Sequence, residues 1–202
     1  MLSYKPNTIS TKFSIFTVSI QYFLCNQTKK EKPIIAKNKP ENWLKITKAS
    51  AVKPLISLIS SADPQLQEYG VTTILNLSLC DENKEFIASS GAIKPLVRAL
   101  RLRTPTTKEN SACALLRLSQ VDENKSPIGR SGAIPLLVNL LESGGFRGKK
   151  DTSSALYSLC SVKENKIRVV QAGIMKPLVE EVFGECGNCL FLGKVEEIRG
   201  CL

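Results

Sequence analysis

The chain has 202 residues, of which 43% are hydrophobic and 23% are charged, and this balance excludes a largely disordered protein. Aromatic residues make up only 6%, which favours helices packed through Leu, Ile, Val and Ala over a β-sandwich. The net charge is +10 and histidine is absent, which excludes Ser-His-Asp and Cys-His catalysis and every metal site that needs an imidazole.

The first segment, residues 1–40, is a basic leader with seven Lys and one Glu. Such a leader is able to touch nucleic acid or an anionic membrane, whereas a solvated, poorly ordered tail explains the same composition. We adopt the second interpretation and expect no nucleic-acid partner. The apolar stretch 13–25 is shorter than the roughly 20 residues that span a bilayer, and no small-residue cleavage site follows it. We therefore predict neither a membrane span nor a working signal peptide.

Three independent markers recur with one period of 41 residues after the leader. The markers are Glu-Asn at 41–42, 82–83, 123–124 and 164–165, Gly-Ala-Ile at 91–93 and 132–134 with Gly173 opening the next copy, and Pro-Leu at 54–55, 95–96 and 177–178. A unit of about 40 residues that holds its register over this distance is typical of a helical solenoid.

Each unit is predicted to contain three helices. The first follows Glu-Asn, as at 84–88, and a glycine such as Gly91 ends it with a sharp turn. The second and third carry apolar residues at helical spacing. The predicted core positions are Leu55, Leu58 and Ile59, Leu96, Ala99 and Leu100, Leu137, Leu140 and Leu141, Ile74, Leu75 and Leu77, Leu115, Leu116 and Leu118, and Leu156, Tyr157 and Leu159. Small residues at Gly70, Thr73, Ser111, Ala114, Thr152 and Ala155 would let neighbouring helices approach closely.

These residues resemble a known repeat. The order Gly-Ala-Ile-x-Pro-Leu-Val, a leucine-rich third helix and then Glu-Asn-Lys resembles the armadillo repeat, and the string from Glu123 to Lys176 is similar to repeats of plant U-box ubiquitin ligases and their armadillo-only relatives. The resemblance implies an all-α fold, a right-handed α-solenoid of about three to three and a half repeats. The expected units are 41–81, 82–122, 123–163 and an incomplete 164–183, followed by a divergent tail at 184–202.

The resemblance also implies that the third helices line a concave face that binds a protein or an extended peptide. The predicted partner-binding residues on this face are Tyr69, Thr72, Asn76, Asn110, Cys113, Arg117, Asp151, Ser154 and Ser158. Asn76 matches the family asparagine that clamps a peptide backbone, and an amide suits that task because it both donates and accepts. Arg117 and Ser158 depart from the asparagine pattern, and Arg117 could instead pair with a carboxylate. The alternative is that these are simply exposed polar residues.

Other motifs in the sequence give weaker evidence of function. Nuclear import receptors of this fold have a tryptophan where Thr72 stands, so an import-receptor groove is not expected. The run 143–150 only partly matches a phosphate-binding loop, and we interpret it as a basic loop between helices. Cys186, Cys189 and Cys201 are too few for structural zinc. We predict no cofactor and no metal, and the odd number of cysteines favours a reducing compartment, the cytoplasm, the nucleus or both.

The predicted function is a protein-binding scaffold or adaptor without enzyme activity, connected with ubiquitin signalling. The alternative is a fragment or relative of a U-box ubiquitin-protein ligase that contributes substrate recognition, since the 40 residues before Glu41 show no U-box signature. The expected third helix at 191–201 has Glu196, Glu197 and Gly200 at core positions. Either the ends are foreign to the repeat through truncation or mis-splicing, or the last unit is an atypical terminal one. A missing third helix would leave the face of Leu178 and Val182 partly open, and we predict that the chain self-associates or is poorly stable.

Overall fold

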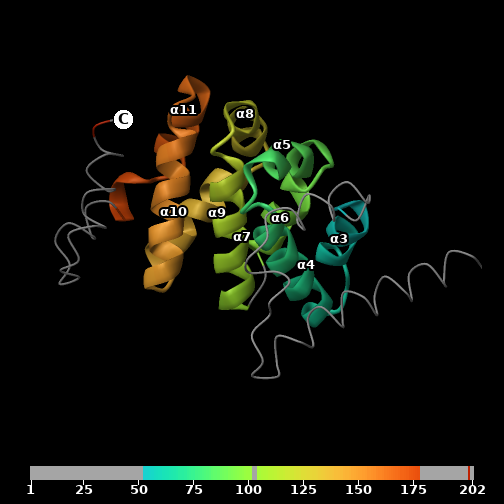
Figure 1. Ribbon diagram of the computed structural model, residues 1–202. Coiled ribbons are helices and arrows are strands. Elements are labelled where there is room, and N and C mark those ends of the chain that lie inside the picture. The colour runs from blue at the N-terminus through green and yellow to red at the C-terminus, as the bar shows by residue number, and fades with distance from the viewer. Residues whose placement is uncertain (1–51, 102–103, 178–199, 201–202) are drawn as a thin grey trace, which may run out of the picture. The chain divides into compact units, whose positions relative to one another are not determined.

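The computed structural model describes residues 52–101, 104–177 and 200 of the chain (Figure 1). The leader, the tail and the expected helix at 191–201 lie outside this part, apart from Gly200. Nine α-helices follow one another in the described residues, with no strand among them. They are α3 (Val52–Ile59), α4 (Pro64–Leu77), α5 (Asp81–Ser89), α6 (Ile93–Ala99), α7 (Pro105–Leu118), α8 (Asp122–Arg130), α9 (Ala133–Ser143), α10 (Phe146–Leu159) and α11 (Lys163–Gln171). The all-α prediction is confirmed.

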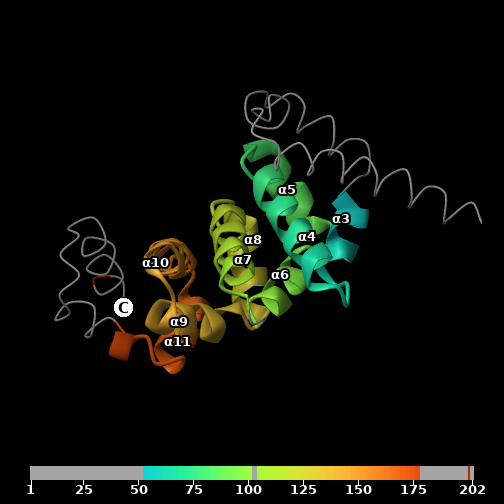
Figure 2. The same cartoon turned by 90° about the horizontal axis from the view of Figure 1, so that it is seen from below.

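The helices keep the spacing that the sequence markers predict. The third helices α4, α7 and α10 begin at Pro64, Pro105 and Phe146, and each starts 41 residues after the one before. They pack side by side in that order, as both views show (Figures 1 and 2). The first helices α5, α8 and α11 lie at one end of them, and the second helices α3, α6 and α9 pack along their other side. The described helices therefore form a stack of equivalent three-helix units.

The core between these helices is aliphatic, as the low aromatic content predicts. Most predicted leucine and isoleucine positions are buried, including Leu55, Leu96, Leu118 and Leu137. The small residues are buried as well, and Gly70 shows why they are needed. A methyl group on Gly70 would come within 2.9 Å of the Ile59 backbone nitrogen, closer than atoms tolerate. Small side chains thus set the distance between α3 and α4.

Three predicted core residues are less buried than expected. Leu58 and Leu116 are half-buried, and Tyr157 is 36% exposed, so the core prediction for Tyr157 is wrong. Leu75, at the equivalent position of α4, is only 8% exposed because α7 packs against α4. The position is only partly covered even within the stack, because Leu116 of α7 is half-buried although α10 packs against α7.

The predicted glycine turns are confirmed. Gly91, Gly132 and Gly173 have φ angles of +91°, +81° and +82°, in the left-handed region that L side chains adopt only with strain. Each glycine follows the C-terminus of a first helix, where it reverses the chain toward the second helix. Substitution of these glycines would therefore strain the backbone even though open space surrounds them.

The asparagine of each described Glu-Asn pair caps the C-terminus of the preceding third helix. Asn83, Asn124 and Asn165 are buried, and their Nδ2 atoms donate to the backbone oxygens six residues earlier, at distances of 3.1, 3.0 and 3.2 Å. Those oxygens belong to the last residues of α4, α7 and α10, where backbone carbonyls have no partner within the helix. The 41-residue marker is therefore a helix-capping hydrogen bond repeated three times.

The lysine of one Glu-Asn-Lys string, Lys84, connects the two ends of its own unit. The Lys84 side chain is nearly buried, and its ammonium group binds the Asp81 carboxylate and the Gln120 side-chain oxygen. Gln120 follows α7, so this contact crosses from the first helix of a unit to the end of its third helix. Lys125 pairs in the same way with Asp122, at 2.6 Å. Lys84 lowers the pKa of the Asp81 carboxyl through this hydrogen bond and its charge.

Adjacent first helices meet at a residue without a side chain. Gly129 of α8 lies against Asn165 of α11, and a methyl group there would stand only 1.8 Å from the Asn165 Oδ1 atom. Asn165 also donates from Nδ2 to the Lys125 oxygen, at 3.0 Å. Gly129 thus allows the asparagine that caps α10 to bind α8 at the same time.

The prediction of a loop over 143–150 is wrong. Only Gly144 and Gly145 separate α9 from α10, and Phe146 already begins the helix. Phe146 occupies the position of Pro64 and Pro105, so the helix keeps the common register. The glycine-rich composition misled the prediction, because Gly148 serves packing. A methyl group on Gly148 would lie 3.0 Å from the Glu109 side chain of α7.

We predict that Asn124→Ala lowers the free energy of unfolding by about 1 kcal/mol, because the Leu118 oxygen would lose one of its two donors and keep only the Val121 backbone N–H. Urea denaturation followed by circular dichroism measures this loss. Asn139→Ala, at an exposed position of α9, is the matched control and should change stability by less than about 0.5 kcal/mol. Equal effects of the two substitutions would contradict a structural role for the cap.

Candidate partner-binding face

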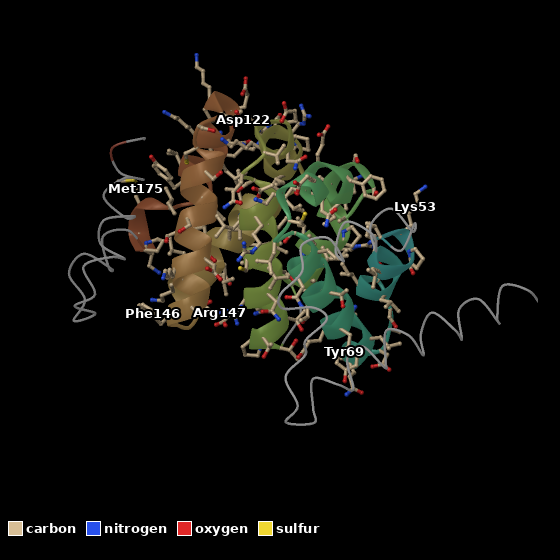
Figure 3. All side chains as sticks on the ribbon, viewed as in Figure 1. Lys53, Tyr69, Asp122, Phe146, Arg147 and Met175 are labelled. Carbon is tan, nitrogen blue, oxygen red and sulfur yellow. The ribbon has the colours of Figure 1, made fainter. Side chains whose placement is uncertain are left out.

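The nine predicted partner-binding residues all lie on the third helices α4, α7 and α10, and we call the surface that they form the long-helix face. Seven of them are half-exposed, whereas Asn110 and Cys113 are each only 7% exposed. Figure 3 shows Tyr69 and Arg147 toward the same end of the long helices, opposite the end where Asp122 lies. The face is therefore a row of polar side chains across neighbouring helices.

Asn110 connects the three helices of the face. Its Nδ2 donates to the Thr72 hydroxyl of α4 at 3.2 Å, and its Oδ1 accepts from Arg147 Nη2 of α10 at 3.2 Å. Both ends of the amide are thus used inside the protein, which explains its burial. The sequence analysis missed Arg147, although it precedes Asp151 by one helical turn and so lies on the same side of α10. Its Nε is 3.9 Å from the Asp151 Oδ2 atom.

Cys113 lies at the centre of the charged part of the face. The Asp151 carboxylate and the guanidinium groups of Arg117 and Arg147 lie close enough to act on its thiol. Burial, the largest cause, and the negative charge of Asp151 together raise the pKa of the Cys113 thiol to about 11, against the opposing effect of the two arginines. The thiol is therefore neutral near pH 7 and unsuited to nucleophilic attack.

The remaining face residues make local contacts. The Ser158 hydroxyl donates to the Ser119 oxygen at the end of α7, at 2.9 Å, and the Ser154 hydroxyl donates to the Lys150 oxygen, at 3.1 Å. The Tyr69 hydroxyl accepts from the Gln65 side chain at 3.1 Å. Asn76 is half-buried in the last turn of α4. The face combines donors and acceptors, which suits binding of peptide groups, and whether these residues contact a partner stays a prediction.

The described part of the chain contains neither a metal-binding cluster nor a membrane-spanning helix. Residues 52–101 and 104–177 hold no group of three or more His, Cys, Asp or Glu side chains arranged to bind a metal ion. Cys186, Cys189 and Cys201 lie outside these residues. None of the described helices combines the length and the apolar character required to cross a bilayer.

The end of the described segment 104–177 carries exposed apolar side chains, on α11 and at Met175 after it. Met175 is 48% exposed, whereas Ile134, at the equivalent position one unit earlier, is fully buried. Ile167 and Val170 of α11 are also about half-exposed. Leu178 and Val182, on which the expected open face depended, lie outside the described residues. Self-association through this end stays a prediction.

The armadillo/beta-catenin-like repeat family matches this chain at residues 80–120 and 122–161. These segments contain the helices α5 to α10 and the capping asparagines Asn83 and Asn124. The two segments are armadillo repeats. The predicted resemblance and the predicted solenoid of armadillo repeats are both confirmed.

Curated relatives include U-box proteins of plants. U-box domain-containing protein 13 of Arabidopsis thaliana is 42% identical over 50 residues, which are 25% of this chain and 8% of that protein. U-box domain-containing protein 12 of Oryza sativa subsp. japonica is 44% identical over 46 residues, or 23% of this chain and 8% of that protein. The chain thus spans less than a tenth of these relatives.

Solved structures of armadillo proteins share the fold. Computationally designed armadillo repeat proteins for modular peptide recognition align with a TM-score of 0.76 and 19% identity, over 91% of this chain and 80% of theirs. A designed armadillo repeat protein in complex with the peptide (KR)4 aligns with a TM-score of 0.72 and 19% identity, over 95% of this chain and 85% of its own. At this identity the likeness establishes the fold alone.

The raised pKa of Cys113 predicts a pH dependence of stability. Below about pH 9 the thiol is protonated in the folded and the unfolded chain, so its contribution to the free energy of unfolding is fully present. Between pH 9 and about 11 only the unfolded chain loses the proton, and stability falls. We expect the difference in unfolding free energy between the protein and Cys113→Ser to shift by on the order of 2 kcal/mol across this range. Urea denaturation at pH 8, 9, 10 and 11 measures it, and parallel curves would contradict the assignment.

Proposed function

We propose that this armadillo solenoid binds an extended segment of another protein along the long-helix face. The observation that carries the proposal is the row of Asn76, Arg117 and Ser158, three half-exposed polar side chains at equivalent positions of α4, α7 and α10. Amide, hydroxyl and guanidinium groups in such a row can pair with successive peptide groups. The designed armadillo proteins of the same fold, described as built for peptide recognition and seen with a bound peptide, support this use of the fold.

Asn76 is the residue that we propose contacts the peptide backbone. It is half-buried, so its amide keeps access to a partner while α4 holds its position. Asn110 is less suited to this role, because Thr72 and Arg147 already occupy its donor and acceptor. The thiols of Cys80 and Cys113 take no part in a disulfide, which fits action in a reducing compartment, and we place the protein in the cytoplasm or the nucleus.

A displayed library of random 12-residue peptides tests the proposed binding. We expect the full chain to enrich specific peptides, and Asn76→Ala to weaken their binding about tenfold through loss of hydrogen bonds to the peptide backbone. Asn139→Ala, on α9, should leave binding unchanged. If no peptide is enriched, or if both variants bind as the unaltered protein does, the proposed use of the long-helix face is wrong.

A role in ubiquitin ligation is the second candidate, favoured by the identity to plant U-box proteins. We propose that the repeats supply substrate recognition in such a pathway, and that any ligase activity comes from a U-box on another chain or elsewhere in a longer protein. This assignment rests on the repeat helices α3 to α11, to which we give a binding role.

An autoubiquitination assay separates the two roles. We expect the purified chain with ubiquitin-activating and ubiquitin-conjugating enzymes to form no conjugates, because the described residues offer a binding surface alone. A known U-box ligase in a parallel reaction is the positive control. Conjugates formed by the purified chain without added ligase would overturn the scaffold role and make the protein an enzyme.

A further inference from the structure

The long-helix face is unevenly charged, and the imbalance lies on α7 and α10. Arg117 and Arg147 both lie near Cys113, so two guanidinium groups gather around one point of the face. The Arg147 side chain is 58% exposed, whereas the Asp151 side chain beside it is only 19% exposed. The positive groups therefore reach farther toward a partner than the negative group that accompanies them.

The two arginines retain hydrogen-bonding capacity. A guanidinium group has five N–H donors in a planar fork. Arg147 donates to Asn110, and its Nε lies 3.9 Å from Asp151, beyond a normal hydrogen bond. The Arg117 Nε is buried and has no hydrogen-bond partner in the protein among the described residues. A buried donor of this kind costs free energy unless something else accepts from it.

The carboxylates near the arginines are turned toward the protein. Asp151 is half-buried, lies near the Cys113 thiol and pairs loosely with Arg147. Glu68 is half-buried and accepts from the Thr107 hydroxyl, at 3.4 Å between α4 and α7. Glu109 is half-buried against Gly145 and Gly148 of α10. These groups bridge neighbouring helices, so they leave the exposed Arg147 fork available to an incoming anion.

We infer that the partner of the long-helix face is an extended peptide with acidic side chains, whose Glu or Asp carboxylates bind the guanidinium groups of Arg117 and Arg147. This inference rests on the proposed function and specifies its ligand. Arginine suits the task because its fork matches the two oxygens of a carboxylate. The hydrogen bond from Arg147 to Asn110 already restricts the Arg147 side chain, so that side chain loses little further freedom when the carboxylate binds.

The test compares three fluorescent 12-residue peptides that differ only in four positions, which are all Glu, all Gln or all Lys. Fluorescence anisotropy with the full chain measures the dissociation constants at low and at physiological salt. We expect the Glu peptide to bind about tenfold more tightly than the Gln peptide, with the Lys peptide weakest, and added salt to weaken the Glu peptide most.

Three variants test whether the preference for the Glu peptide depends on Arg147. Arg147→Gln should reduce the advantage of the Glu peptide about tenfold, and Arg147→Lys should retain part of it because charge remains without the fork. Arg130→Gln removes the same charge from an exposed position at the end of α8 and should change nothing. Circular dichroism melting confirms that each variant is folded.

The outcomes separate this inference from the proposed function. Equal binding of the three peptides, tighter binding of the Lys peptide, or equal effects of Arg147→Gln and Arg130→Gln would overturn the acidic ligand. In each case Asn76-dependent binders of neutral or basic sequence from the displayed library would leave the proposed function intact. Failure of the Glu peptide to bind overturns the inference, and failure of the library overturns the function.

Discussion

The hydrogen bond from a buried asparagine to the end of the preceding helix is the interaction on which the stack depends. Asn83, Asn124 and Asn165 each bind a terminal carbonyl of α4, α7 or α10 and so fix the angle at which the chain leaves that helix. Since the third helices pack directly on one another, a fixed exit places each new unit against the last. Buried carbonyls need such partners, so the spacing of the asparagines also fixes the length of the unit.

Most of the fold could be predicted because its physical demands leave marks in the sequence. A left-handed turn needs glycine, so Gly91, Gly132 and Gly173 were found from their period. The Glu-Asn marker was also found, but its capping role was not, because a partner six residues back is visible only in three dimensions. The helix start at Phe146 was missed for the opposite reason. A glycine such as Gly148 suggests a loop in the sequence, but in the structure the Glu109 side chain leaves little room for a side chain at this position.

The long-helix face could be predicted only in outline. Helical spacing places Tyr69, Asn76 and Asp151 on the third helices, and the structure agrees. Spacing within one helix does not reveal which polar groups are used by a neighbouring helix, so the burial of Asn110 was unexpected. Arg147 was overlooked because it was assigned to a loop. The face thus serves two purposes, since the contacts that join the helices also orient the groups that remain for a partner.

The contact between Gly129 and Asn165 means that the units are not interchangeable modules. At the next-to-last position of each first helix the stack carries a different residue, Ala88 in α5, Gly129 in α8 and Val170 in α11. A unit grafted after α11 in the same register would bring its own asparagine against the Val170 side chain, where Gly129 offers a hydrogen atom. Protein engineers who wish to lengthen this solenoid would have to redesign that seam first, because each joint is fitted to one particular neighbour.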